Sequence, residues 1–238
     1  MKSLIALFGA SILGASALFA SSPAPAASGK EYVVLSGGPS LMIWEKWKNP
    51  PHDLWWQNFV RAAEVRIAQL EADGANPATI TWFVYQPSYV TRGRQDGKDY
   101  LGDISTRAKA LGVRLRWFRS AEEVFNYLNA GQPRDRVKVA DFEYFGHSNR
   151  ACWMFDYSNQ IDSASKVWIH EDELWQIAPQ AFESKAYVKS WGCHTGESMS
   201  QKFRRRTGQR MWGAVGRTQY MTNEVPVLSD ASAGKWRY

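Results

Sequence analysis

Apolar residues along this chain form short runs that alternate with amphipathic stretches, the pattern of a parallel α/β sheet. Short apolar runs bounded by turn residues predict strands at 31–36, 79–84, 113–117, 137–144, 186–189 and 211–216. Apolar residues spaced three and four apart predict helices at about 53–72, 100–111, 120–128 and 199–203, with a polar loop at 92–97. This order predicts an α/β fold of three layers, with a mostly parallel central sheet flanked by helices.

Two polar motifs follow consecutive strands of the predicted sheet. Phe145-Gly146-His147-Ser148-Asn149 closes one strand, and Ser190-Trp191-Gly192-Cys193-His194-Thr195-Gly196 closes the next. A helix is expected between them at 170–177, because acidic residues at its start suit a helix N-terminus. A crossover of this kind joins parallel strands, so His147 and Cys193 are expected side by side at the carboxyl edge of the sheet.

A cysteine beside a histidine suggests nucleophilic chemistry. A thiol is a weak nucleophile until it becomes a thiolate, and a nearby imidazole can take its proton and return it to a leaving group. His147 and Cys193 are therefore the candidate catalytic pair. A structural role for His147, as a hydrogen-bond donor to a loop carbonyl, is the alternative.

The two motifs resemble those of caspase-like cysteine peptidases, most closely the metacaspases and the bacterial CHAT-type domains. The resemblance covers about residues 30–220 and implies a caspase-like fold. It also implies that His147 acts as general base and acid and Cys193 as nucleophile. The oxyanion hole would use the backbone N–H of Cys193 and one near Gly146 and Ser148.

The chain departs from that family at two positions. Ser148 stands where the family usually has glycine after the histidine, and Trp191 stands where metacaspases have an aspartate that receives basic side chains. Cleavage after arginine or lysine is therefore not implied. Gly192 would give the cysteine loop room, and Trp191, Arg217 and Tyr220 are the candidate walls of a substrate pocket.

The start of the chain indicates export. Lys2 followed by an apolar stretch and small residues is typical of a secretory signal peptide over 1–26, with a single domain over 27–238. The apolar stretch is shorter than the ~20 residues that span a bilayer, so no stable membrane anchor is expected after cleavage. The protein is expected in the periplasm or outside the cell.

Charge and composition narrow the range of partners. The formal net charge of +6 is moderate, and the one dense basic cluster, 202–206, is short. Nucleic acid is therefore not an expected partner; a peptide or protein substrate is. The chain has no Cys-x-x-Cys or His-Glu-x-x-His motif, so neither a metal nor a cofactor is expected. The sequence does not indicate an oligomeric state.

The two cysteines offer a competing interpretation. An exported protein with Cys152 and Cys193 as its only cysteines can join them in a disulfide, which would consume the nucleophile. The leading hypothesis is an exported caspase-like cysteine peptidase that uses Cys193 and His147. The alternative is a non-catalytic caspase-like module that binds a partner in the envelope, with Cys152 and Cys193 bridged.

Overall fold

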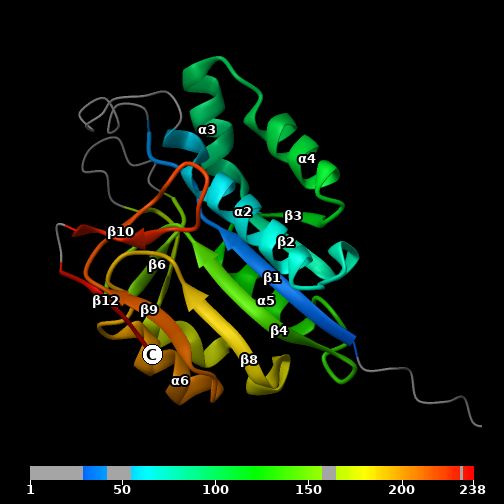
Figure 1. The fold of residues 1–238 in the computed structure, drawn as a ribbon, viewed down its shortest axis with the longest axis vertical. Coiled ribbons are helices and arrows are strands. Elements are labelled where there is room, and N and C mark those ends of the chain that lie inside the picture. The colour runs from blue at the N-terminus through cyan, green and yellow to red at the C-terminus, as the bar shows by residue number, and fades with distance from the viewer. Residues whose placement is uncertain (1–28, 42–54, 157–164, 231–232) are drawn as a thin grey trace, which may run out of the picture.

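The computed structural model describes residues 29–41, 55–156, 165–230 and 233–238, and its centre is a seven-stranded sheet. The strands run in the order β12-β9-β8-β4-β1-β2-β3 (Figure 1). Neighbouring strands are parallel except β12, which is antiparallel to β9. Their bounds are β1 (Gly29–Ser36), β2 (Ile80–Tyr85), β3 (Arg114–Phe118), β4 (Val137–Phe145), β8 (Phe182–Ser190), β9 (Met211–Val215) and β12 (Lys235–Arg237).

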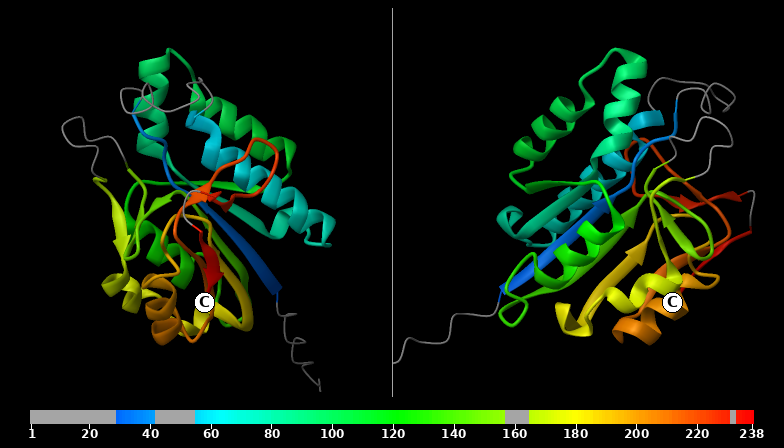
Figure 2. Two further views of the ribbon diagram at one scale, coloured as in Figure 1. Left: turned by 60° about the vertical axis from the view of Figure 1, so that its left-hand side comes forward. Right: turned by 180° about the vertical axis from the view of Figure 1, so that it is seen from behind.

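Helices cover both faces of the sheet (Figures 1 and 2). One face packs against α2 (Asn58–Ala72), α3 (Gln86–Asp96) and α4 (Tyr100–Ala110), which follow a short 3-10 turn, η1 (Trp55–Gln57). The other face packs against α5 (Ala121–Ala130) and α6 (Met199–Thr207). The predicted three-layer α/β fold with a mostly parallel sheet is confirmed.

Alternation along the strands divides the buried side chains between these two faces. Val33 and Leu35 of β1 lie in the core beneath α5 and α6, whereas Val34 between them lies in the core beneath α2. In β2, Phe83 faces the first core and Trp82 the second. A strand that is buried on both faces reads as a continuous apolar run, which is why these strands were recognisable from sequence.

The crossover from β4 to β8 differs from the prediction. It contains a small antiparallel sheet of β5 (His147–Ser148), β6 (Cys152–Met154) and β7 (Trp168–His170), and then two 3-10 helices, η3 (Glu171–Gln176) and η4 (Pro179–Ala181). The α-helix predicted at 170–177 is thus the six-residue 3-10 helix η3. Pro179 explains its shortness, because the residue before a proline is disfavoured in helical conformation.

The polar loop predicted at 92–97 is wrong, since these residues form the end of α3 and its cap. Arg92 is only 3% exposed and pairs with Asp96 one turn later, at 2.7 Å. Gly97 then ends the helix in the left-handed region, at φ 63°. The polar composition concealed a helix whose charged side chains neutralise one another.

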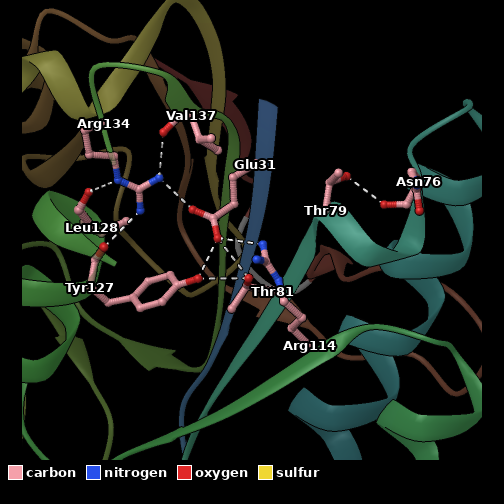
Figure 3. A network of polar contacts seen from close by, with 9 residues as sticks. All are labelled: Glu31, Asn76, Thr79, Thr81, Arg114, Tyr127, Leu128, Arg134 and Val137. Carbon is pink, nitrogen blue, oxygen red and sulfur yellow. Dashed lines mark hydrogen bonds and ion pairs between the residues drawn. The ribbon is translucent and has the colours of Figure 1, made fainter. Parts of the chain in front are cut away.

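A buried polar network lies near the start of β1, at the amino ends of the parallel strands (Figure 3). Glu31 is fully buried and accepts hydrogen bonds from Arg134 at 2.6 Å, Arg114 at 3.0 Å and the hydroxyl of Thr81 at 2.9 Å. Tyr127 of α5 also donates to it, at 2.5 Å. The network ties α5 and the following turn to three neighbouring strands.

The predicted signal peptide, 1–26, lies outside the described residues. Among the described residues, no helix is both long and apolar enough to cross a membrane.

Candidate active site

The point where the strand order reverses defines the first candidate location for a ligand. From β1 the chain adds β2 and β3 on one side, and then β4, β8 and β9 on the other. The reversal lies between β1 and β4, which end at Ser36 and Phe145. In open α/β sheets, ligands bind beyond the carboxyl ends of the strands at such a reversal. Residues 37–40 and 146–148 meet there.

His147 is held at this edge by three parts of the fold. Its Nε2 is 3.2 Å from the hydroxyl of Ser40, which follows β1. Its ring meets that of Phe59 in α2 edge to face, with 4.9 Å between centroids. Its carbonyl accepts a hydrogen bond of 2.6 Å from the Tyr144 hydroxyl. The imidazole therefore has a defined position and remains partly exposed.

Cys193 follows β8, the parallel neighbour of β4, as predicted. The hydroxyl of Ser148 donates to the Cys193 carbonyl at 2.7 Å, which joins the two loops that carry the candidate pair. The Cys193 thiol is partly exposed and is contacted by Thr218. The Thr218 N–H is 3.4 Å from the sulfur and its hydroxyl oxygen 3.5 Å away. The sulfur is also 3.8 Å from the Thr218 carbonyl oxygen, to which the thiol can donate.

The candidate pair is not in direct hydrogen-bond contact. Among the described residues, the polar contacts of the Cys193 thiol all come from Thr218, so none comes from His147. The backbone N–H of Cys193 likewise has no acceptor within the described part of the chain. Catalytic hydrogen bonds are often long before substrate binds and shorten in the complex, so this separation is compatible with a catalytic pair.

Two glycines leave room for close contacts in the loops after β4 and β8. A Cβ at Gly192 would lie 2.1 Å from the Ser148 hydroxyl oxygen and 3.0 Å from the Gly146 carbonyl oxygen. A Cβ at Gly146 would lie 2.1 Å from the Tyr144 hydroxyl oxygen. Gly192 therefore lets the loop after β8 adjoin the loop after β4, and Gly146 leaves room for the Tyr144 hydroxyl that holds the His147 carbonyl.

His194 has a different neighbour from Cys193. It adopts a left-handed conformation, with φ 64°, and its Nδ1 is 2.6 Å from the Glu197 carboxylate. Burial acts to raise the pKa of Glu197, but hydrogen bonds from His194 and the Gly216 N–H outweigh it and lower that pKa. The polar contact of the His194 ring is thus with Glu197.

Both cysteines are free thiols in this structure. Cys152 lies in β6, where burial, followed by the charges of Glu173 and Glu171, raises the pKa of its thiol to about 11. A disulfide between Cys152 and Cys193, the alternative drawn from sequence, is not the state that the structure describes.

The three predicted pocket residues, Trp191, Arg217 and Tyr220, differ in burial and in their distance from the site. Trp191 is only 6% exposed, stacks on Phe145 and donates its indole N–H to Glu143 at 2.5 Å. It therefore lies largely beneath the site, where little of its surface is available to line a pocket. The fully buried carboxylate of Glu143, which also pairs with Arg66, needs hydrogen-bond donors and holds the indole there.

Tyr220 and Arg217 belong to a segment that lies over the carboxyl ends of the strands. Its two short strands, β10 (Thr218–Gln219) and β11 (Val227–Leu228), form an antiparallel pair (Figure 1). The Tyr220 hydroxyl accepts a hydrogen bond from the Gly146 N–H at 2.8 Å, so this residue does reach the site. Arg217 is exposed, and its carbonyl accepts from the Ser229 N–H at the base of the hairpin.

The glycines after β1 serve the fold rather than an anion. The Gly37 N–H donates to the Phe145 carbonyl at 2.8 Å, and the Gly38 N–H donates to the Phe155 carbonyl at 2.9 Å. Both donors are occupied. No group of three or more His, Cys, Asp or Glu side chains is placed to hold a metal ion in the described ranges.

Sequence reasoning missed three residues of the site: Ser40, Phe59 and Thr218. Ser40 had a signal, because it follows β1, a neighbour of β4 in a parallel sheet. Thr218 lies between Arg217 and Tyr220, the predicted pocket residues, but its contact with the sulfur depends on how the β10–β11 hairpin packs. Phe59 had no signal, because its contact depends on how α2 packs.

Comparison with protein-family models, curated proteins and solved structures finds no match to this chain.

Proposed function

We propose that this chain is an exported cysteine peptidase of the caspase-like type. One observation carries the proposal: Cys193 and His147 follow adjacent parallel strands at the reversal of strand order, on loops joined by the Ser148–Cys193 hydrogen bond. Cys193 supplies a nucleophile and His147 a base, and they lie beyond the carboxyl ends of the strands, where α/β sheets bind ligands.

The proposed reaction uses only these side chains and water. His147 takes the thiol proton of Cys193, and the sulfur attacks the peptide carbonyl. The carbonyl oxygen carries the negative charge of the tetrahedral intermediate until the C–N bond breaks, and His147 protonates the departing amine. Water then hydrolyses the thioester and regenerates the thiol.

The test is hydrolysis of a mixed peptide library, followed by mass spectrometry with Cys193→Ala and Cys152→Ala variants compared. We expect Cys193→Ala to lose the cleavage products and Cys152→Ala to keep them. His147→Ala should lose activity as well, while His194→Ala, which alters the neighbouring imidazole, should retain it. Cleavage that survives Cys193→Ala would contradict the proposal.

A second candidate is a non-catalytic module that binds a partner in the envelope. The observation in its favour is that the Gly146 N–H, a donor that an oxyanion would use, is already occupied by Tyr220. This candidate predicts no cleavage of any library peptide, and a Cys193 thiol whose reactivity does not change in His147→Ala.

A further inference from the structure

The donors available to an oxyanion beside Cys193 are few. A tetrahedral intermediate needs N–H or O–H groups directed at the oxygen as charge develops. The Cys193 N–H has no acceptor among the described residues, so it can serve. The Gly146 N–H cannot serve in this arrangement, because it donates to the Tyr220 hydroxyl at 2.8 Å. A second donor must therefore come from elsewhere.

The Tyr220 hydroxyl lies in the direction in which the Gly146 N–H points. Its oxygen accepts from Gly146 N–H, so its own proton remains to be donated. The Gly146 carbonyl is 3.5 Å away, at the outer limit of a hydrogen bond, and competes weakly for that proton. An O–H whose oxygen already accepts a hydrogen bond is polarised into a better donor.

The phenol is also fixed in place. The ring of Tyr220 meets the ring of Phe59 at 4.9 Å, and the same Phe59 ring lies 4.9 Å from that of His147. Burial raises the pKa of Tyr220 well above its usual value, the hydrogen bond from the Gly146 N–H opposes this rise, and the charge of Cys193 adds to it. The phenol therefore keeps its proton at neutral pH.

We propose that the Tyr220 hydroxyl is the second oxyanion donor of this site, held in position by the Gly146 N–H. The inference rests on the proposed function. As the Cys193 sulfur forms its bond to the carbonyl carbon, the C=O electron pair moves onto oxygen, which accepts hydrogen bonds from the Tyr220 O–H and the Cys193 N–H. No proton is transferred from the phenol. When the oxyanion collapses, the leaving group departs and both hydrogen bonds weaken.

Two thiol reactions separate this role from a structural one. p-Nitrophenyl acetate acylates a thiolate through an oxyanion, whereas iodoacetamide alkylates it by displacing iodide and forms none. Both rates are measured for Cys193 in a Cys152→Ala background, with and without Tyr220→Phe. Tyr238→Phe is the matched control, because Tyr238 packs on Trp212 near the far edge of the sheet. The ratio of acylation to alkylation isolates the oxyanion donor.

We expect Tyr220→Phe to slow acylation about 10²-fold, the effect of removing one oxyanion donor, and to leave alkylation within about twofold. Tyr238→Phe should change neither rate. Unchanged acylation in Tyr220→Phe overturns the inference. Faster acylation and alkylation overturn it as well, because they would mean that Tyr220 obstructs the site.

Failure of the proposed function has a different signature. If His147→Ala alters neither acylation nor alkylation of Cys193, there is no catalytic pair, and the inference falls with it. If Tyr220→Phe does not fold, a ring-fluorinated tyrosine at position 220 replaces it. That side chain keeps the shape and donates more strongly, so acylation should accelerate relative to alkylation, and an unchanged ratio would overturn the inference.

Discussion

Replacing Arg134 by methionine tests the buried network at the start of β1. The Arg134 side chain is 5% exposed and faces Glu31, which is fully buried (Figure 3). Breaking a buried ion pair by removing one partner costs about 3–5 kcal/mol, because an uncompensated charge stays behind. Arg134 also donates to the carbonyls of Leu128 and Tyr127 near the end of α5, and each such bond contributes about 1 kcal/mol.

Glu31 would keep three donors after this change, those of Arg114, Thr81 and Tyr127. The loss should therefore fall near the middle of the range, and we expect Arg134→Met to lower the free energy of unfolding by about 4 kcal/mol. Adding Glu31→Gln removes a buried carboxylate that has only Arg114 left as a cationic partner among the described residues, so the double variant should recover about 2 kcal/mol.

The assay is urea unfolding at pH 7, followed by tryptophan fluorescence and circular dichroism. Arg136→Met is the control, because its pair with Asp135 is 59% and 72% exposed and should contribute under about 1 kcal/mol. If Arg134→Met lowers stability no more than Arg136→Met does, the network does not have the energetic role described.

Three further predictions concern the site and the charged cluster beneath it. At pH 8 iodoacetamide should modify Cys193 at least about tenfold faster than Cys152, because the Cys152 thiol has a pKa of about 11 and is almost wholly protonated at that pH. Equal rates of modification, measured by peptide mass spectrometry, would contradict this. Burial, with the charge of Glu143, raises the pKa of Asp141 well above its usual value, so the contribution of this carboxyl to stability is fully present below about pH 4 and decreases as the pH rises. Asp141→Asn should abolish that decrease in urea unfolding between pH 4 and 8, and an unchanged pH dependence would count against the assignment. Gly192→Ala should lower stability by about 1–3 kcal/mol and slow Cys193 labelling, since its Cβ would overlap Ser148; wild-type values for both would show that the loops need not adjoin.

The layers of the fold were predictable because the strands are buried on both faces. Residues 32–35 and 82–84 are continuous apolar runs, and the structure has strands at Gly29–Ser36 and Ile80–Tyr85. The helix α3 was not predictable from apolar spacing, because its fixed points are the buried Arg92 and its ion pair with Asp96. Gly97 was the signal available for the end of that helix.

The site was predictable only as far as strand order reaches. His147 and Cys193 follow parallel neighbours, so a sheet prediction places them on one edge. The contacts that hold them do not follow from a strand pattern. Thr218 reaches the Cys193 sulfur and Tyr220 the Gly146 N–H through packing of the β10–β11 hairpin, which has no periodic signature in the sequence.

The most direct test of the central claim is the rate at which iodoacetamide alkylates Cys193 in the wild type, His147→Ala and His194→Ala, measured at limiting reagent without reductant. If the two residues act as a pair, removing His147 slows alkylation by about tenfold or more at neutral pH, because the imidazole no longer takes the thiol proton. His194→Ala should react at the wild-type rate. Equal rates in all three proteins would contradict the claim that His147 activates Cys193.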